Sequence, residues 1–173
     1  MISTNSVFIV EGQNDKELLS RFFNTEIVTT NGSYVSRETI KYIEGLKKHH
    51  DIVIITDPDG PGKAIREKLL DTFPEAKVVL IDKNKSIRKG KVGLAETEIA
   101  PLIALIMPLL SAEKSLPTKL ELRDLIAFAK INPDFKKIIS NDYPVGNVNN
   151  RTMIKRLQYL RIEKSEIENK ING

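Results

Sequence analysis

The sequence predicts an α/β fold, in which a parallel sheet is flanked by helices, followed by a small helical domain. Short apolar runs rich in Val and Ile alternate with helix-period segments along residues 6–81. Turn residues separate these segments, and each strand–helix–strand unit is long enough for a right-handed crossover. From residue 118 onward only helical patterns follow. These three observations place the sheet in the N-terminal half of the chain.

The first two strand–helix pairs lie in the N-terminal 48 residues. We expect strands over residues 6–10 and 26–29, and helices over residues 15–23 and 36–48. Asn14 and Glu17 have the spacing of a capping box at the start of the first helix. The apolar residues expected to form the buried face of that helix are Leu18, Leu19, Phe22 and Phe23.

The next part of the chain continues the alternation. We expect a strand over residues 52–56, a helix over 62–73 and a strand over 77–81. A strongly apolar stretch then covers residues 99–110. Pro101 and Pro108 interrupt this stretch, so we expect a buried, broken helix rather than a clean amphipathic one.

Residues 111–117 mark the expected boundary of a second domain. Thr118 and Glu121 form another capping-box pattern before the helical segment LRDLIAFA. Further helices are expected over residues 134–139, 150–161 and 165–171. In the helix over 150–161 the residues expected to pack inward are Met153, Ile154, Leu157 and Leu160. The basic residues expected on its other faces are Arg151, Lys155, Arg156 and Arg161.

Carboxylates follow two of the predicted strands directly. Asp57 and Asp59 come after the strand over residues 52–56, and Glu11 comes after the strand over residues 6–10. Because parallel strands end at the same edge of a sheet, we expect the three carboxylates to lie there together. Carboxylate oxygens are the ligands that Mg²⁺ prefers. The alternative for residues 57–59 is a solvated turn, since Asp, Pro and Gly are common turn residues.

Other residues near these strand ends suit a phosphate-binding site. Gly12 allows a ligand to approach the backbone beside Glu11. The sequence Asn31-Gly32-Ser33 follows another strand end and either presents N–H and hydroxyl groups to a phosphate or forms a plain turn. Arg66, in the helix after Asp59, either clamps the scissile phosphate or pairs with a carboxylate.

The residue types favour hydrolysis by a metal-activated water. The chain has no cysteine, and its two histidines, His49 and His50, have no partner at ligand spacing. A divalent cation between carboxylates offsets their repulsion and lowers the pKa of a bound water. Asp57 and Asp59 are the expected primary ligands, and Glu11 is either a third ligand or the acid/base group.

The charge is unevenly distributed along the chain. Residues 1–81 carry a net charge of −2, residues 82–93 carry +4, and residues 114–173 carry +5. Lys and Arg contacts to phosphate supply most of the sequence-independent affinity for nucleic acid. A solvated surface segment is the alternative for each basic region. Next to three carboxylates we expect the basic regions to hold a polyanionic substrate.

Several motifs resemble those of one known family. Glu11-Gly12 followed by Asp15, and then Asp57 and Asp59, is similar to the motif of the Toprim domain. The segments TTNGSYVSRETI, TDPDGPGKAIR and GKVGLAETE, and the C-terminal run VGNVNNRTMIKRLQYLRIEKSEIENKI, resemble the 5S ribosomal RNA maturation endonucleases, the ribonuclease M-five family. These segments occur in both halves of the chain and in the order found in that family.

The resemblance implies a Toprim catalytic domain over residues 1–111 and a small helical RNA-binding domain over residues 118–173. It implies a Mg²⁺-dependent endoribonuclease that cuts precursor 5S rRNA in its terminal double-stranded region. It further implies help from the large-subunit ribosomal protein that binds 5S rRNA. The basic residues expected to contact RNA are Lys83, Lys85, Arg88, Lys89, Lys91, Arg66, Arg151, Lys155 and Arg156. One departure is the fourth loop, where the acidic position of the family is absent or shifted to Glu96 or Glu98.

Other activities are less compatible with the sequence. Another Toprim protein acting on DNA, in nicking or recombination, is the first alternative. A receiver-like phospho-acceptor with Asp57 as acceptor needs an acid pair after the first strand, and Glu11 and Asp15 are spaced too far apart for that. A binding module without catalysis has no need of three carboxylates at strand ends.

Composition gives an expectation about location. No window approaches the roughly 18 consecutive apolar residues of a membrane helix. The first residues lack the basic and apolar regions of a signal peptide. We therefore expect a soluble, cytoplasmic protein.

Overall fold

The computed structural model describes residues 1–32, 34–81, 87–88, 91–92, 99–112 and 119–172. The chain forms two compact units. The first consists of Met1–Thr39 and His50–Lys114, and the second of Ile40–His49 and Ser115–Gly173.

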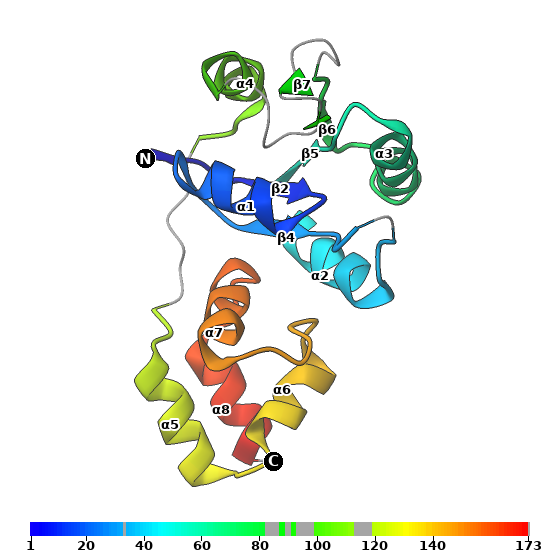
Figure 1. Cartoon of the computed structure of the whole chain (residues 1–173). Helices are drawn as coiled ribbons and strands as arrows, with labels where there is room; N and C mark the ends of the chain where they lie inside the picture. Colours follow the sequence, from blue (N-terminus) through cyan, green and yellow to red (C-terminus); the bar gives the residue numbers. More distant parts are fainter. Residues whose placement is uncertain (33, 82–86, 89–90, 93–98, 113–118, 173) are drawn as a thin grey trace. The chain divides into compact units, whose positions relative to one another are not determined.

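A parallel four-stranded sheet is the centre of the first unit (Figure 1). Its strands lie in the order β4 (Ile27–Thr29), β2 (Ser6–Val10), β5 (Asp51–Ile55) and β6 (Lys77–Val79). All pairings are parallel, with Ile9 opposite both Val28 and Ile54. The predicted α/β fold is therefore confirmed. Residues 6–10 and 52–55 are fully or almost fully buried, as is typical of a parallel sheet covered on both faces.

The helices along this part of the chain are α1 (Gln13–Ser20), α2 (Arg37–Lys47), α3 (Gly60–Thr72) and α4 (Ile99–Ile106), and of α2 only residues 37–39 belong to the first unit. They follow the strands in the predicted order. The residues from 40 on in α2 belong to the second compact unit. Leu19 of α1 and Leu102 and Ile106 of α4 join Phe8, Val53 and other strand residues in one hydrophobic core.

The prediction that α1 continues to Phe23 is wrong. The helix ends at Ser20, and Phe23 lies in a short strand β3 (Phe23–Asn24) that pairs in parallel with β1 (Ile2–Ser3). The N–H of Ile2 donates to the carbonyl of Phe22 at 2.7 Å. The Phe23 ring packs edge-on against Phe8 with the ring centroids 5.0 Å apart. This pairing and packing prevail over the helical spacing of the apolar residues.

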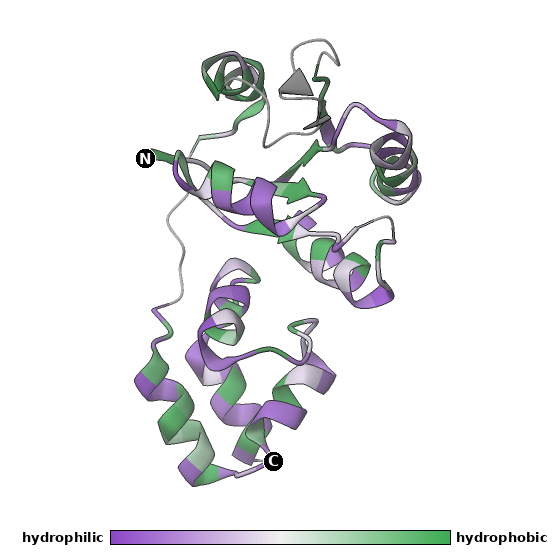
Figure 2. Cartoon of the chain, in the orientation of Figure 1, coloured by the Kyte–Doolittle hydropathy of each residue, from purple (hydrophilic) through white to green (hydrophobic). Residues whose placement is uncertain are grey.

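Helix α4 is apolar on every side (Figure 2). Pro101 lies in its first turn, where its missing N–H costs no helix hydrogen bond. The break comes at residues 107–109, which form a 3₁₀ turn around Pro108. Leu102 and Ile106 are buried, but Leu105 and Met107 are each 46% exposed, so the predicted break is confirmed and the predicted burial holds for one face only. No helix in the described parts of the chain is long and apolar enough to cross a membrane.

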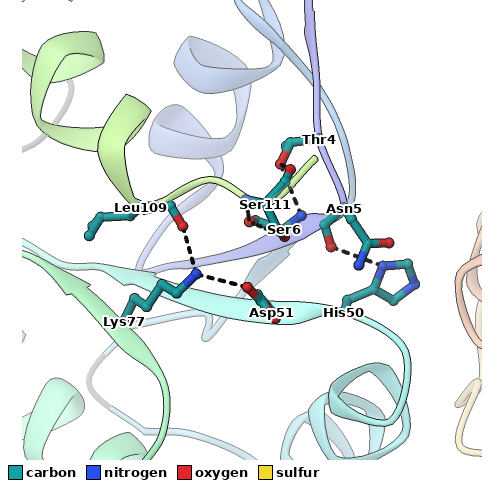
Figure 3. A network of polar contacts seen from close by, with 8 residues as sticks. All are labelled: Thr4, Asn5, Ser6, His50, Asp51, Lys77, Leu109 and Ser111. Atoms are coloured by element: carbon teal, nitrogen blue, oxygen red, sulfur yellow. Dashed lines mark hydrogen bonds and ion pairs between the residues drawn. The ribbon is translucent and has the colours of Figure 1, made fainter. Parts of the chain in front are cut away.

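A network of polar contacts joins the segment after α4 to the amino-terminal ends of the strands (Figure 3). The Ser111 N–H donates to the Ser6 hydroxyl at 3.0 Å, and the Thr4 hydroxyl donates to the Ser111 carbonyl at 2.7 Å. Lys77 donates both to the Leu109 carbonyl at 3.0 Å and to Asp51 at 2.8 Å. These contacts lie at the opposite edge of the sheet from Glu11 and Asp57.

The second unit is built mainly from the four helices α5 (Leu122–Ile131), α6 (Phe135–Asp142), α7 (Asn150–Tyr159) and α8 (Lys164–Asn172). Its interior contains Phe128, Ile139, Leu157 and Ile167, each with no exposed surface. Of the four residues predicted to pack inward from α7, three are buried and Ile154 is partly exposed.

Both predicted capping boxes are displaced from the observed helix starts. At α1 the Asp15 carboxylate accepts the N–H of Gly12 at 2.9 Å, in place of the expected pair Asn14 and Glu17. At α5 the Asp124 carboxylate accepts the N–H of Glu121 at 2.7 Å. In each case the carboxylate of an Asp at the third helical position accepts the backbone N–H of the N-cap residue. As a result, α1 begins earlier than predicted and α5 begins later than predicted.

Candidate active site

Glu11 and Asp57 meet at the carboxyl edge of the sheet. Glu11 directly follows β2, and Asp57 lies two residues after the end of the adjacent parallel strand β5. The Asp57 backbone N–H donates to Glu11 Oε1 at 2.5 Å. The expected convergence of these two strand ends is therefore present as a direct contact between the two residues.

Asp59 is placed by the start of α3. It is the N-cap residue, and its Oδ1 accepts the N–H of Gly62 at 2.8 Å. Residues 60–62 form the first turn of the helix, with Pro61 among its first residues, where proline is well tolerated. The turn formed by residues 57–62 thus brings Asp59 close to the Glu11–Asp57 contact and holds part of its carboxylate in a helix cap.

Gly62 permits the close approach of this turn. A Cβ at residue 62 would overlap the carbonyl oxygen of Asp57 and lie 2.5 Å from Glu11 Oε1. No side chain fits there without a shift of the backbone or of Glu11. Sequence reasoning did not single out Gly62, although its place three residues after an N-cap Asp was a usable signal.

The carboxyl group of Glu11 has an unusual pKa. Its pKa is raised from an ordinary 4.5 to about 7, and burial is the largest cause. The negative charges of Asp57, Asp59 and Asp15 raise the pKa as well, in that order of size. The hydrogen bond from the Asp57 N–H acts in the opposite direction. Glu11 therefore titrates near neutral pH, as is typical of a group that exchanges protons or binds a cation.

The loop after β4 lies against Glu11. Asn31 and Gly32 have positive φ angles of 60° and 95°, which Asn and Gly tolerate best. The N–H of Gly32 donates to the Glu11 carbonyl at 3.3 Å, and the Thr30 hydroxyl donates to the Gly32 carbonyl at 3.1 Å. Asn31 and Gly32 are thus brought to the predicted edge, while Ser33 lies outside the described residues.

Arg66 points back to the end of β5. Its Nη1 donates to the hydroxyl of Thr56 at 2.9 Å, and Thr56 is 2% exposed. Among the described residues, the structure shows no ion pair between Arg66 and a carboxylate. The hydrogen bond fixes the residue that immediately precedes Asp57, a link that the spacing of the sequence did not reveal.

The side chains at this edge have the donor atoms that a metal ion needs. Carboxylate oxygens are suitable donors for a hard divalent cation, and the negative charges of Asp57 and Asp59 contribute, after burial, to the raised pKa of Glu11. In the part of the chain that the structure describes, no three His, Cys, Asp or Glu side chains are grouped so that they could already hold a metal ion. The chemistry of the site fits a cation, without a preformed three-carboxylate cluster.

Apart from Arg66 in α3, the predicted RNA-binding residues divide into three groups. Lys83, Lys85 and Lys89 lie outside the described residues, as do Glu96 and Glu98 of the fourth loop. Arg88 and Lys91 lie in the antiparallel strands β7 (Ile87–Arg88) and β8 (Lys91–Val92).

The third group lies in α7, within the second unit. Arg151 is exposed, and Lys155 lies 5.7 Å from the centroid of the Tyr159 ring. Arg156 instead lies over the Tyr42 ring at 4.5 Å and donates to the Val145 carbonyl at 2.7 Å. These contacts engage Arg156 inside its own unit.

Comparison with known proteins is consistent with this geometry. Residues 6–97 match the Toprim domain. The chain is similar to Ribonuclease M5 of Mycoplasma genitalium, with 27% identity over 96% of this chain and 94% of that protein. It is also similar to Ribonuclease M5 of Bacillus subtilis, with 25% identity over 92% of this chain and 89% of the relative.

One partial match and one solved structure add to these findings. Ribonuclease M5 of Mesoplasma florum is 38% identical over 53% of this chain and 55% of that protein. A small TOPRIM domain protein from Bacillus stearothermophilus has a solved structure that is 25% identical. It superimposes with a TM-score of 0.53 and covers 65% of this chain and 96% of its own.

Proposed function

The chain belongs to the Toprim domain family, and we propose that it is a metal-dependent endoribonuclease that cuts precursor 5S rRNA in its terminal double-stranded region. Similarity to several proteins named Ribonuclease M5 extends over almost the whole chain, including both units. The contact of Glu11 with the Asp57 N–H carries the proposal, because it puts an acid/base group beside a second carboxylate at the carboxyl edge. No observation favours the alternative of a DNA-acting Toprim protein.

Asp57, Asp59 and Glu11 are the residues that would hold Mg²⁺. When bound, this ion polarises a phosphoryl oxygen and lowers the pKa of a coordinated water. Asp59 keeps the start of α3 in place through its cap to Gly62, and so fixes the turn that carries both aspartates. The Asp57 N–H holds one oxygen of Glu11 in a fixed direction.

Glu11 has two candidate roles that make different demands. As a metal ligand it must stay ionised, which a nearby cation favours. As the acid/base group it exchanges a proton near its pKa of about 7. Because Oε1 accepts the Asp57 N–H, that proton is held on Oε2.

Arg66 and the Asn31–Gly32 loop organise the surroundings of the carboxylates. Arg66 holds Thr56, and thereby the strand end from which Asp57 projects. The loop is bound to the Glu11 backbone by the Gly32 N–H. We propose that the basic segment over residues 82–93 and the basic second unit bind the RNA, and that a large-subunit ribosomal protein bound to 5S rRNA assists.

The substrate class is tested by comparing four nucleic acids with the purified protein in Mg²⁺. The four are a precursor 5S rRNA transcript, the same transcript bound to the ribosomal protein, an unrelated RNA hairpin and duplex DNA. We expect cleavage of the precursor in its terminal stem, faster with the ribosomal protein, and little cleavage of the hairpin or DNA. Preferential nicking of duplex DNA would contradict the proposal.

A further inference from the structure

A cavity in the second unit is not used by the proposed chemistry. It has a volume of about 310 Å³ and lies between α6, the α6–α7 loop and the start of α7. Figure 1 shows this loop connecting α6 to α7. The residues that line the cavity are Lys136, Lys137, Ser140, Asn147, Val148 and Met153. No acidic residue is among these described residues, so the cavity has a positive lining.

Lys136 and Lys137 are available to a ligand. Both side chains are exposed, and neither ammonium group forms a hydrogen bond or an ion pair with any described residue. Two other lysines of the unit have acidic partners: Lys164 pairs with Asp124 and Lys170 pairs with Asp142. The charge of Lys136 and Lys137 is therefore uncompensated within the described part of the unit.

Hydrogen bonds that do not involve the two lysine side chains hold the backbone segments around the cavity in place. Ser140 donates to the carbonyl of Gly146, which has a positive φ of 68°. Asn149 caps α7 by accepting the Thr152 N–H at 3.0 Å. The first turn of α7 borders the cavity through Met153, and the amino end of a helix carries a partial positive charge. The exposed amide of Asn147 adds a further polar group.

A phosphate group matches this combination. Lysine ammonium groups, amide side chains and helix amino ends are the groups that contact phosphate oxygens in nucleic-acid complexes. Arg156, the central cation of α7, is bound to Tyr42 and Val145 and is less available. On the basis of the proposed function, we propose that the cavity of Lys136, Lys137 and Asn147 binds a backbone phosphate of the RNA substrate.

The test is RNA affinity measured against salt concentration. Binding of a precursor 5S transcript is followed by filter binding, with all proteins carrying Asp57→Asn so that the RNA stays intact. The double variant Lys136→Gln/Lys137→Gln is compared with Lys119→Gln/Lys130→Gln. The second pair removes the same charge from exposed positions of the same unit that do not line the cavity. Lys136→Arg/Lys137→Arg restores the charge, and thermal midpoints verify folding.

We expect the cavity variant to bind about tenfold more weakly at physiological salt. Its plot of log K against log salt concentration should be shallower by about 0.7 to 0.9 for each phosphate that the variant no longer neutralises. The control pair should change much less, and the arginine pair should bind like the parent. Equal weakening by both glutamine pairs, no weakening by the cavity pair, or no RNA binding by the parent would overturn the site.

The proposed function is measured separately, as cleavage of the precursor by the wild-type chain. Weak binding by the cavity variant with no wild-type cleavage would retain the phosphate site and remove the enzymatic assignment. Cleavage by the wild type together with unchanged RNA binding by the cavity variant would retain the enzymatic assignment and rule out the phosphate site.

Discussion

Gly62 determines how closely the turn after β5 can approach Glu11. Its N–H is bound by Asp59, and the position of its missing Cβ is occupied by Asp57 and Glu11. Glycine is unfavourable in a helix, so alanine at an unhindered helical position is usually stabilising. At residue 62 the steric overlap opposes that gain. The glycine is therefore needed so that the turn carrying Asp57 can lie close to Glu11.

Gly62→Ala is expected to lower both stability and cleavage. Overpacking of this kind costs about 1–3 kcal/mol, and displacement of Glu11 should reduce the cleavage rate at least about tenfold. Gly60→Ala is the matched control, because nothing lies within 4 Å of a Cβ built there. Thermal unfolding and single-turnover cleavage measure the two effects. A Gly62→Ala protein that behaves like Gly60→Ala would contradict the close packing at the site.

The raised pKa of Glu11 predicts how stability depends on pH when no divalent cation is present. The folded protein holds the Glu11 proton up to about pH 7, whereas the unfolded chain releases it near 4.5. Stability from this group is therefore fully present below pH 4.5 and is lost as the pH rises through about 7.

Glu11→Gln should remove this loss, so its thermal midpoint in EDTA should rise relative to the wild type between pH 5 and pH 8. Glu17→Gln, at an exposed position of α1, is the control. Mg²⁺ should reduce the difference by stabilising the ionised wild type. A constant difference between Glu11→Gln and wild type across this pH range would show that Glu11 is not perturbed.

At the scale of elements, periodicity predicted the four strands of the central sheet and the order of the helices, and tertiary contacts decided where these elements end. The β-branched runs of β2 and β5 identified buried strands, and parallel pairing then implied that Glu11 and Asp57 lie together. The contact of Glu11 with a backbone N–H depends on side-chain rotation, which spacing does not specify. The helical spacing of Phe22 and Phe23 was overridden by pairing of β1 with β3.

The helix caps also show that sequence patterns alone do not specify where a helix begins. A capping-box pattern identifies residue types that can satisfy the first N–H groups, but several positions in a polar segment qualify. The observed caps use Asp15 and Asp124, each at the third helical position. Helical position alone also did not reveal the contacts of Arg156, because a long side chain can reach from one face of a helix over a neighbouring ring.

The polar network at the amino edge of the sheet is expected to support the fold and not the chemistry. Ser6 is fully buried, and its hydroxyl accepts the Ser111 N–H. Ser6→Ala should therefore cost about 1–3 kcal/mol by leaving that group without its partner. The rate of cleavage below the unfolding temperature should remain that of the wild type. Ser20→Ala, exposed at the end of α1, should change neither quantity, and a large loss of activity in Ser6→Ala would connect this edge to the site.

At the scale of the whole molecule, the segment proposed to carry out catalysis and the segments proposed to bind RNA have opposite net charges. The segment containing the carboxylates is net negative, whereas residues 82–93 and 114–173 are net positive. This distribution of charge predicts that substitutions of the carboxylates abolish cleavage without weakening RNA binding, and that substitutions of the basic residues weaken RNA binding. The sequence revealed the basic regions, but the contacts of Arg156 and the cavity beside Lys136 and Lys137 required the folded second unit.

The most direct test of the account is cleavage and binding of precursor 5S rRNA by Asp57→Asn and Asp59→Asn. Asparagine at residue 59 retains the ability to cap α3, so loss of charge is separated from loss of structure. We expect both variants to lose cleavage by at least about a thousandfold, roughly 4 kcal/mol of barrier, with RNA affinity within about twofold of the wild type. Cleavage by both variants at near wild-type rate in Mg²⁺ would contradict the assignment of the carboxylates as the catalytic centre.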